Sequence, residues 1–270
     1  MPVASAHRDN RRMNPRIVLV TGGSRGIGAA TAVLCARHGY DVAVNYARDA
    51  AAALRVAEAV RVLGRRAVVV AGDVSREADV LRLFAAVDAE LGPLTALVNN
   101  AGVVDVAARV DEMGADRLTR MFGINVIGSM LCAREAVRRM STRHGGGPWS
   151  AAGGHRGGAI VNLSSAAARL GAPGQYVDYA AAKGAIDTFT LGLAREVATE
   201  GIRVNAVRPG IIETDIHASG GQPDRAAQMA PQVPMRRAGS ADEVAEAIAW
   251  LLSDAASYVT GTVIDVTGGR

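Results

Sequence analysis

The chain has 270 residues, of which 49% are hydrophobic and 21% charged, and its formal net charge is +4. This length is enough for one large α/β domain with a full core. No apolar run reaches 18 residues, which argues against a transmembrane helix, and the arginines are scattered without an interleaved aromatic strip, which argues against nucleic-acid binding.

The start of the chain, residues 1–15, is polar and contains no apolar stretch. It therefore predicts a disordered N-terminal tail rather than a secretory signal. Cys35 and Cys132 fall in apolar, helical surroundings, which is typical of buried thiols in a cytoplasmic protein. We expect a cytoplasmic protein with no membrane segment and no metal site.

Short β-branched runs alternate with helical patterns through the rest of the chain, 16–270. The expected strands are 16–20, 41–46, 67–71, 96–100, 159–164, 203–207 and 262–266. The expected helices are 29–38, 50–63, 76–91, 115–143, 177–199 and 241–253. Repeated strand–helix units predict a single domain, a doubly wound parallel sheet with helices on both faces.

Two segments interrupt this alternation. The glycine-rich stretch 144–158 is predicted to be a surface loop without chemistry. The stretch 210–237 follows the carboxyl end of a strand, where ligands bind in such sheets, and long connections there are typical of lids. We therefore predict that 210–237 is a substrate-binding lid.

Tyr179 and Lys183 are four residues apart, a spacing that places two side chains on the same face of a helix. Lys183 is the only lysine in the chain, against 29 arginines. An ammonium group is a compact point charge, which arginine cannot replace. Beside a phenol it favours the phenolate and lowers the tyrosine pKa from about 10, so the pair predicts a general acid or base.

A glycine motif, TGGSRGIG at 21–28, lies between the first expected strand and the first expected helix. In this context glycines allow a tight turn and let backbone amides approach a diphosphate at the helix N-terminus. The motif therefore predicts a dinucleotide site.

Further motifs follow in order: Asp73-Val74, NNAG at 99–102, Asn125, a serine pair at 164–165, YAAAK at 179–183 and Arg208-Pro209-Gly210. With these motifs the chain resembles the short-chain dehydrogenase/reductase family over nearly all of its length after the tail. It is similar to bacterial sugar dehydrogenases and to 3-oxoacyl-carrier reductases. The resemblance implies a Rossmann fold with seven strands in the order 3-2-1-4-5-6-7 and hydride transfer between NADP(H) and a small carbonyl or alcohol substrate.

The resemblance also implies roles for individual residues. The implied catalytic residues are Asn125, Ser165, Tyr179 and Lys183. The implied cofactor-binding residues are Gly22, Ser24, Arg25, Gly26, Ile27, Gly28, Tyr46, Arg48, Asp73, Val74, Asn100, Ala101, Gly102, Tyr179, Lys183, Pro209, Gly210, Ile212 and Thr214. In the family the serine is the second of a pair, thirteen residues before the tyrosine. Here Ser165 is fourteen before it, so Ser165 is the first choice and Ser164 the alternative. Asn125 matches an asparagine that kinks its helix and holds a water for proton relay.

The expected cofactor is NADP(H), with NAD(H) as the alternative. An NAD site places an acidic residue at the tip of the second strand, where it accepts a hydrogen bond from the ribose. Here the strand ends in Asn45-Tyr46-Ala47-Arg48, without a carboxylate. Arg25 and Arg48 are placed to bind a 2′-phosphate instead. Tyr46 at this tip also occurs in relatives that accept both cofactors.

Other readings of the same scaffold remain open. Some relatives bind a nucleotide only as regulators, but they do not need the intact serine, tyrosine and lysine. Dehydration or epimerisation on this scaffold has no support in the sequence. Family resemblance, the apolar stretch 259–266 and the helices 115–143 and 177–199 together predict a homotetramer.

Overall fold

The computed structural model describes residues 16–145 and 157–270. The predicted tail, 1–15, and most of the predicted loop, 144–158, lie outside these residues. The strands are β1 (Arg16–Val20), β2 (Tyr40–Tyr46), β3 (Ala67–Ala71), β4 (Ala96–Asn99), β5 (Gly158–Leu163), β6 (Ile202–Pro209) and β7 (Val263–Val266). They form one sheet in the order β3-β2-β1-β4-β5-β6-β7, and every pairing is parallel. The predicted strand order is confirmed.

Ten α-helices are assigned within the described residues. They are α1 (Gly26–Arg37), α2 (Ala50–Val62), α3 (Glu77–Glu90), α4 (Ala115–Phe122), α5 (Gly128–Met140), α6 (Ala167–Leu170), α7 (Val177–Val197), α8 (Ile216–Ser219), α9 (Arg225–Met229) and α10 (Ala241–Leu252). Short 3-10 turns occupy η1 (Val110–Glu112), η3 (Thr142–His144), η4 (Ala198–Glu200), η5 (Ala230–Gln232) and η6 (Asp254–Ala256), and η2 (Gly123–Ile127) is a π-helix. Helix α2 begins directly after Asp49, whose carboxylate accepts a hydrogen bond from the Ala52 amide at 2.9 Å and so caps the helix.

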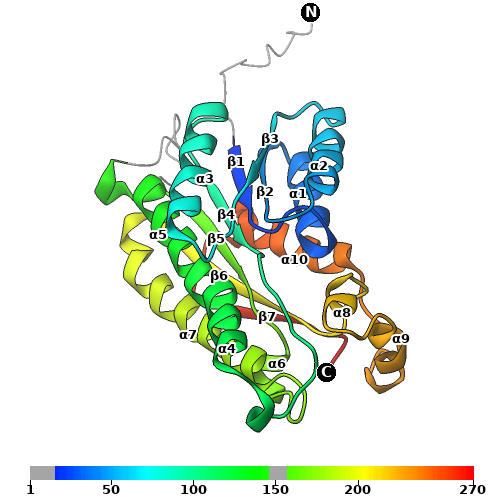
Figure 1. Ribbon diagram of the computed structural model, residues 1–270. Coiled ribbons are helices and arrows are strands. Elements are labelled where there is room, and N and C mark those ends of the chain that lie inside the picture. The colour runs from blue at the N-terminus through cyan, green and yellow to red at the C-terminus, as the bar shows by residue number, and fades with distance from the viewer. Residues whose placement is uncertain (1–15, 146–156) are drawn as a thin grey trace, which may run out of the picture.

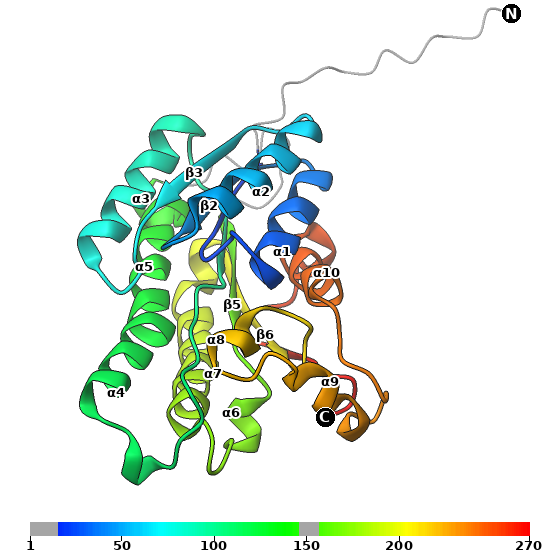
Figure 2. The same cartoon turned by 45° about the vertical axis from the view of Figure 1, so that its right-hand side comes forward.

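The sheet is covered on both faces (Figures 1 and 2). Helices α1, α2 and α10 pack on one face, and α3, α5 and α7 pack on the other. The position of β1 in the sheet explains why its sequence is apolar throughout. Val18 and Val20 belong to the first of these cores, while Ile17 and Leu19 belong to the second. Because alternate side chains point to opposite faces, a strand buried on both sides needs apolar residues at every position.

The helix expected over 115–143 is interrupted, and this correction has a physical cause. The π-helix η2 separates α4 from α5, and Asn125 lies within it. Gly128 begins α5 against Val74, where an added Cβ would lie 2.7 Å from a Val74 methyl carbon. The chain therefore passes close to the segment after β3 while Asn125 turns inward. A π-helix of this length frequently marks a functional site.

The segment 210–237 also contains more regular structure than the sequence indicated. It holds α8, α9 and η5, and α9 lies beside the end of the chain (Figure 2). These helices have three to five residues each, too few for an apolar period to be recognised. No helix among the described residues is long and apolar enough to cross a membrane.

Candidate active site

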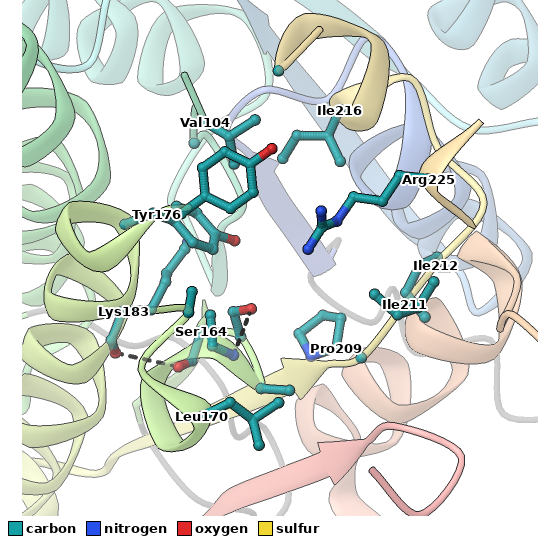
Figure 3. A pocket seen from close by; sticks show the side chains of 18 of the residues that line it. Val104, Ser164, Leu170, Tyr176, Lys183, Pro209, Ile211, Ile212, Ile216 and Arg225 are labelled. Carbon is teal, nitrogen blue, oxygen red and sulfur yellow. Dashed lines mark hydrogen bonds between the residues drawn. The ribbon is translucent and has the colours of Figure 1, made fainter. Parts of the chain in front are cut away.

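A cavity of about 650 Å³ lies at the carboxyl ends of β4, β5 and β6. Leu163 and Pro209, the last residues of β5 and β6, line it, and so do Asn100 and Gly102 directly after β4. Helix α7 and the segment 210–237 close its other sides (Figure 3). This is the edge at which doubly wound sheets bind ligands.

Tyr179 and Lys183 both line the cavity from α7, as their spacing predicts. The Lys183 ammonium is 5.6 Å from the centre of the Tyr179 ring. It is only 4% exposed and donates a hydrogen bond to the Leu163 carbonyl at 2.6 Å. Burial lowers the pKa of Lys183 to about 8, an effect that Asp187 partly opposes.

One expectation about this pair is not met in the structure. Burial raises the pKa of Tyr179, and Ser165 opposes the rise. The Lys183 ammonium donates to the Leu163 carbonyl, and its charge does not offset the burial of the phenol. The spacing correctly predicted that Tyr179 and Lys183 lie on the same face of α7, but it did not predict the direction in which the ammonium points.

Ser164 and Ser165 have different partners. Ser164 is 3% exposed and its hydroxyl donates to the Lys183 carbonyl at 3.3 Å. Ser165 is half-buried, lowers the pKa of its neighbour Tyr179, and accepts from the Ala167 amide at 3.1 Å. The structure therefore places Ser165, not Ser164, beside the phenol.

Asn125 is fully buried, and its side-chain amide clamps the backbone of Val103. The amide oxygen accepts from the Val103 nitrogen at 2.9 Å, and the amide nitrogen donates to the Val103 oxygen at 2.9 Å. A Cβ on Gly102 would lie 2.7 Å from this amide oxygen and 3.6 Å from the Lys183 nitrogen. Asn125 thus holds the segment after β4 against the lysine. The water relay stays a prediction.

The glycine motif has the geometry of a cradle for a ligand. Gly22 and Gly26 have φ of +60° and +54°, a region that favours glycine. A Cβ on Gly28 would lie 2.4 Å from the Asn100 side-chain nitrogen and 2.6 Å from the Gly22 oxygen. Helix α1 begins directly behind this turn, with no acidic residue in its first turn and no side-chain cap. Its first amides are therefore available to an anion, so the turn fits a dinucleotide diphosphate.

Two neighbouring strands hold the glycine turn in place. Asn100 donates from its side chain to the Thr21 and Gly22 carbonyls, both at 2.9 Å. Asn45, at 2% exposure, accepts from the Gly22 amide at 3.2 Å and donates to the Gly72 carbonyl at 3.0 Å. The supporting role of Asn45 was not predicted, although an asparagine near the end of a buried strand is a visible signal in the sequence.

The residues expected at the adenosine end lie around the tip of β2. Arg25 and Arg48 are exposed, and within 16–145 and 157–270 neither forms an ion pair. Tyr46 is half-buried and packs on the first core. The Asp73 carboxylate accepts from the Ser75 amide and hydroxyl at 3.0 and 2.7 Å. Of the other residues expected here, Ala101 is half-buried and Val74 is buried, and Ser24, expected beside the diphosphate, is half-buried.

The segment after β6 joins the two halves of the site. The predicted residues Pro209, Gly210, Ile212 and Thr214 all line the cavity, as does Ile27. A Cβ on Gly26 would lie 3.3 Å from a Thr214 methyl carbon. The glycine turn and the predicted nicotinamide segment are therefore in contact. Lining residues that the sequence analysis did not single out include Val104, Leu170, Gln175, Tyr176 and Arg225.

Comparisons with known proteins agree with this geometry. Residues 22–270 match a family model described as enoyl-(acyl carrier protein) reductase. An uncharacterized oxidoreductase of Escherichia coli is 54% identical, over 94% of this chain and 99% of its own. A cis-4-hydroxycyclohexanecarboxylate dehydrogenase of Sinomonas cyclohexanicum is 42% identical, over 94% and 96% of the two chains.

A solved structure has the same fold as this chain. The crystal structure of a short-chain type dehydrogenase/reductase from Mycobacterium marinum superposes with a TM-score of 0.85 at 32% identity, covering 95% of this chain and 96% of the other. The chain is thus a member of the short-chain dehydrogenase/reductase family of oxidoreductases.

Proposed function

We propose that this protein interconverts a carbonyl compound and the corresponding secondary alcohol with NADP(H). Family membership implies a nicotinamide cofactor, NAD or NADP. The observation that carries the reaction type is that Ser165, Tyr179 and the buried Lys183 line the same cavity. Together they supply a hydrogen-bond donor, a proton donor and a cation for a carbonyl oxygen that gains a proton.

In the proposed reduction, the Ser165 and Tyr179 hydroxyls donate hydrogen bonds to the substrate carbonyl oxygen. The nicotinamide, when bound, supplies the hydride to the carbonyl carbon. As negative charge develops on the oxygen, the Tyr179 phenol transfers its proton to it, so that an alcohol forms and a phenolate remains. Oxidation of the alcohol uses the same groups in reverse.

Lys183 has two proposed tasks in this scheme. Its ammonium stabilises the phenolate left by proton transfer, and a lysine whose pKa is about 8 can also exchange a proton near neutral pH. It is also placed to hold the nicotinamide ribose. Asn125 positions the segment beside it and is proposed to direct the water that restores the proton.

The preference for NADP(H) over NAD(H) is supported by the charges around the glycine turn. Strand β2 ends in Asn45 and Tyr46 without a carboxylate, and Asn45 accepts a hydrogen bond from the glycine turn. Arg25 and Arg48 are the cations available for a 2′-phosphate. We expect Arg25→Ala to lower kcat/KM with NADPH by about 10- to 100-fold, the usual worth of a hydrogen bond to a charged group. Activity with NADH should not fall, and equal losses with both cofactors would contradict the assignment.

We further propose that the protein is a homotetramer. Strand β7 is the edge of the sheet, and its Val263, Ile264 and Val266 are only half-buried. A second apolar surface lies on α4, η2 and α7, where Phe122, Ile127 and other large side chains are exposed. Such surfaces usually mark interfaces. Sedimentation velocity at micromolar concentration should give four times the monomer mass, and a monomer would contradict the proposal.

The reaction itself is tested with a panel of ketones, sugars, cyclic oxo acids and 3-oxoacyl thioesters. The absorbance of NADPH reports each turnover. Cyclic oxo acids are included because one relative is named for a hydroxycyclohexanecarboxylate. Oxidation of NADPH by at least one carbonyl, with the alcohol as product, is the expected result. A protein that binds NADPH and turns over no member would support a regulatory, nucleotide-binding role instead.

A further inference from the structure

The cavity extends from the catalytic groups to the segment 210–237, and its lining there is mostly apolar (Figure 3). The apolar side chains on this side include Val104, Leu170, Pro173, Ile211, Ile216 and Met229. No acidic residue of the described chain lines the cavity, whereas Lys183, Arg225 and Arg270 do. The walls therefore suit a hydrocarbon body, and their charge favours an anion.

Arg225 is the cation that reaches into this part of the cavity (Figure 3). It begins α9, and its guanidinium donates to the Gln222 side-chain oxygen at 2.6 Å and to the Gln175 side-chain oxygen at 2.8 Å. Its central carbon lies 5.3 Å from the centre of the Tyr176 ring. Two amides and an aromatic ring thus fix the orientation of the guanidinium.

The charge of Arg225 has no counterpart among the described residues, since both of its acceptors are neutral amides. Two other arginines show the usual arrangement in this chain. Arg237 pairs with Glu243, and Arg208 pairs with Asp187. A guanidinium has five N–H donors, and the two glutamines use only two of them. A half-buried cation held in place beside apolar walls, with donors to spare, is a binding group for a carboxylate.

The position of Arg225 relates this group to the reaction. Tyr176 is the N-cap residue of α7, and Tyr179 lies three residues further along the same helix. Three residues advance a helix by about 4.5 Å. Tyr176, on which the guanidinium stacks, and Tyr179 both line this cavity of about 650 Å³, so Arg225 and the proton donor face the same space.

We propose that Arg225 binds a carboxylate of the substrate, so that the enzyme acts on a hydroxy or oxo acid with a compact hydrocarbon body. The inference rests on the proposed function, because it describes the substrate of the same site. The competing explanation is that Arg225 only pins α9 to Tyr176 and Gln175. Loss of a purely structural contact would affect neutral and anionic substrates equally, whereas loss of a carboxylate-binding group would affect only the anionic ones.

The kinetic test compares 4-oxocyclohexanecarboxylate with its methyl ester, which has the same ring but no charge. For the acid, Arg225→Gln should lower kcat/KM by about 10- to 100-fold, mainly through KM. For the ester, the change should stay within about threefold, and Arg225→Lys should restore part of the loss on the acid. Arg195→Gln is the matched control, because this exposed arginine near the end of α7 lies outside the cavity lining. Equal losses on acid and ester would overturn the proposal.

A third substrate tests whether Arg225 binds a carboxylate of the substrate or a phosphate of a carrier. Acetoacetyl-coenzyme A carries its negative charge on the phosphates of a carrier rather than on the reacting molecule. If Arg225→Gln impaired only this thioester, the arginine would serve a carrier phosphate, and the carboxylate proposal would be wrong.

A binding measurement keeps this inference separate from the proposed function, because it needs no turnover. Isothermal titration of the NADP⁺-saturated protein with cyclohexanecarboxylate should show binding that cyclohexanecarboxamide lacks and that Arg225→Gln removes. If this holds while no carbonyl is reduced, the anion site stands and the proposed reaction fails. If carbonyls are reduced but the acid binds no better than the amide, the anion site fails alone.

Discussion

Lys183 offers the sharpest physical prediction, because it is the only lysine of the chain and is almost fully buried. Its pKa falls from an ordinary value of 10.5 to about 8. Between these two values the unfolded chain binds a proton that the folded chain has lost. The free energy of unfolding therefore rises with pH across this window, and below pH 8 the buried ammonium costs roughly 3 kcal/mol.

The perturbation is Lys183→Met, which keeps the length of the side chain and removes the charge. The variant also leaves the Leu163 carbonyl without its donor, which costs about 1–3 kcal/mol at every pH and so cancels between pH values. Linkage leaves a cost of roughly 3 kcal/mol from the ammonium at pH 7 and about 1–2 kcal/mol at pH 9.5. The difference in stability between variant and wild type should therefore shift by roughly 2 kcal/mol in favour of the wild type over this interval.

Urea unfolding followed by circular dichroism, at one protein concentration and at both pH values, measures this shift. Other groups that titrate at alkaline pH do not contribute to the measured shift. Burial raises the pKa of Cys35, Cys132 and Tyr40 to about 12, and both proteins carry these groups. A stability difference that stays constant from pH 7 to pH 9.5 would refute the lowered pKa of Lys183. The variant should also lose nearly all turnover, whatever its stability.

Three further predictions concern the surroundings of this pair. Ser165→Ala should lower kcat by about 10²–10³-fold, as loss of a donor to a developing oxyanion does, and Ser164→Ala by less than about tenfold; the reverse order in steady-state assays would reassign the serine. Asn45→Leu should lower both the stability, by about 2–4 kcal/mol, and the affinity for NADPH, because it orphans the bonds to the glycine turn. Asn205→Leu is its control, because Asn205 is equally buried in β6 but bonds to Val259 and Thr262 instead of the glycine turn. It should lower stability alone, so equal NADPH affinities in the two variants by fluorescence titration would argue against a role for Asn45. Amide hydrogen exchange in 210–237 should slow when NADPH and a substrate analogue bind, and unchanged rates would contradict the lid.

The strands and the long helices could be predicted from the sequence because their signals are local. The apolar run of β1 and the pattern of α2 after Asp49 each specify an element without knowledge of its neighbours. The π-helix could not be predicted in this way. Its inward turn depends on bonds between Asn125 and Val103, which are 22 residues apart, and such tertiary bonds have no periodic signature.

The candidate site shows the same division. Tyr179 and Lys183 were predicted together because helical spacing alone places them on one face. The direction of the ammonium depends on the Leu163 carbonyl, at the end of a strand 20 residues earlier. Arg225 lay within the predicted lid but received no role of its own, because it is one of 29 arginines. Its place in the cavity lining and its two neutral amide acceptors set it apart only in the folded structure.

The central claim is that Tyr179 transfers the proton that accompanies hydride transfer, and one measurement tests it directly. NADPH is bound to the wild type and to Tyr179→Phe, binding is confirmed by fluorescence, and a single turnover is started by mixing with a carbonyl substrate found in the panel. The predicted result is unchanged NADPH affinity with a rate of NADPH oxidation lower by about 10²–10⁴-fold, the usual contribution of general acid catalysis. A Tyr179→Phe variant that keeps more than about a tenth of the wild-type rate would contradict the account, since the proton would then come from another group.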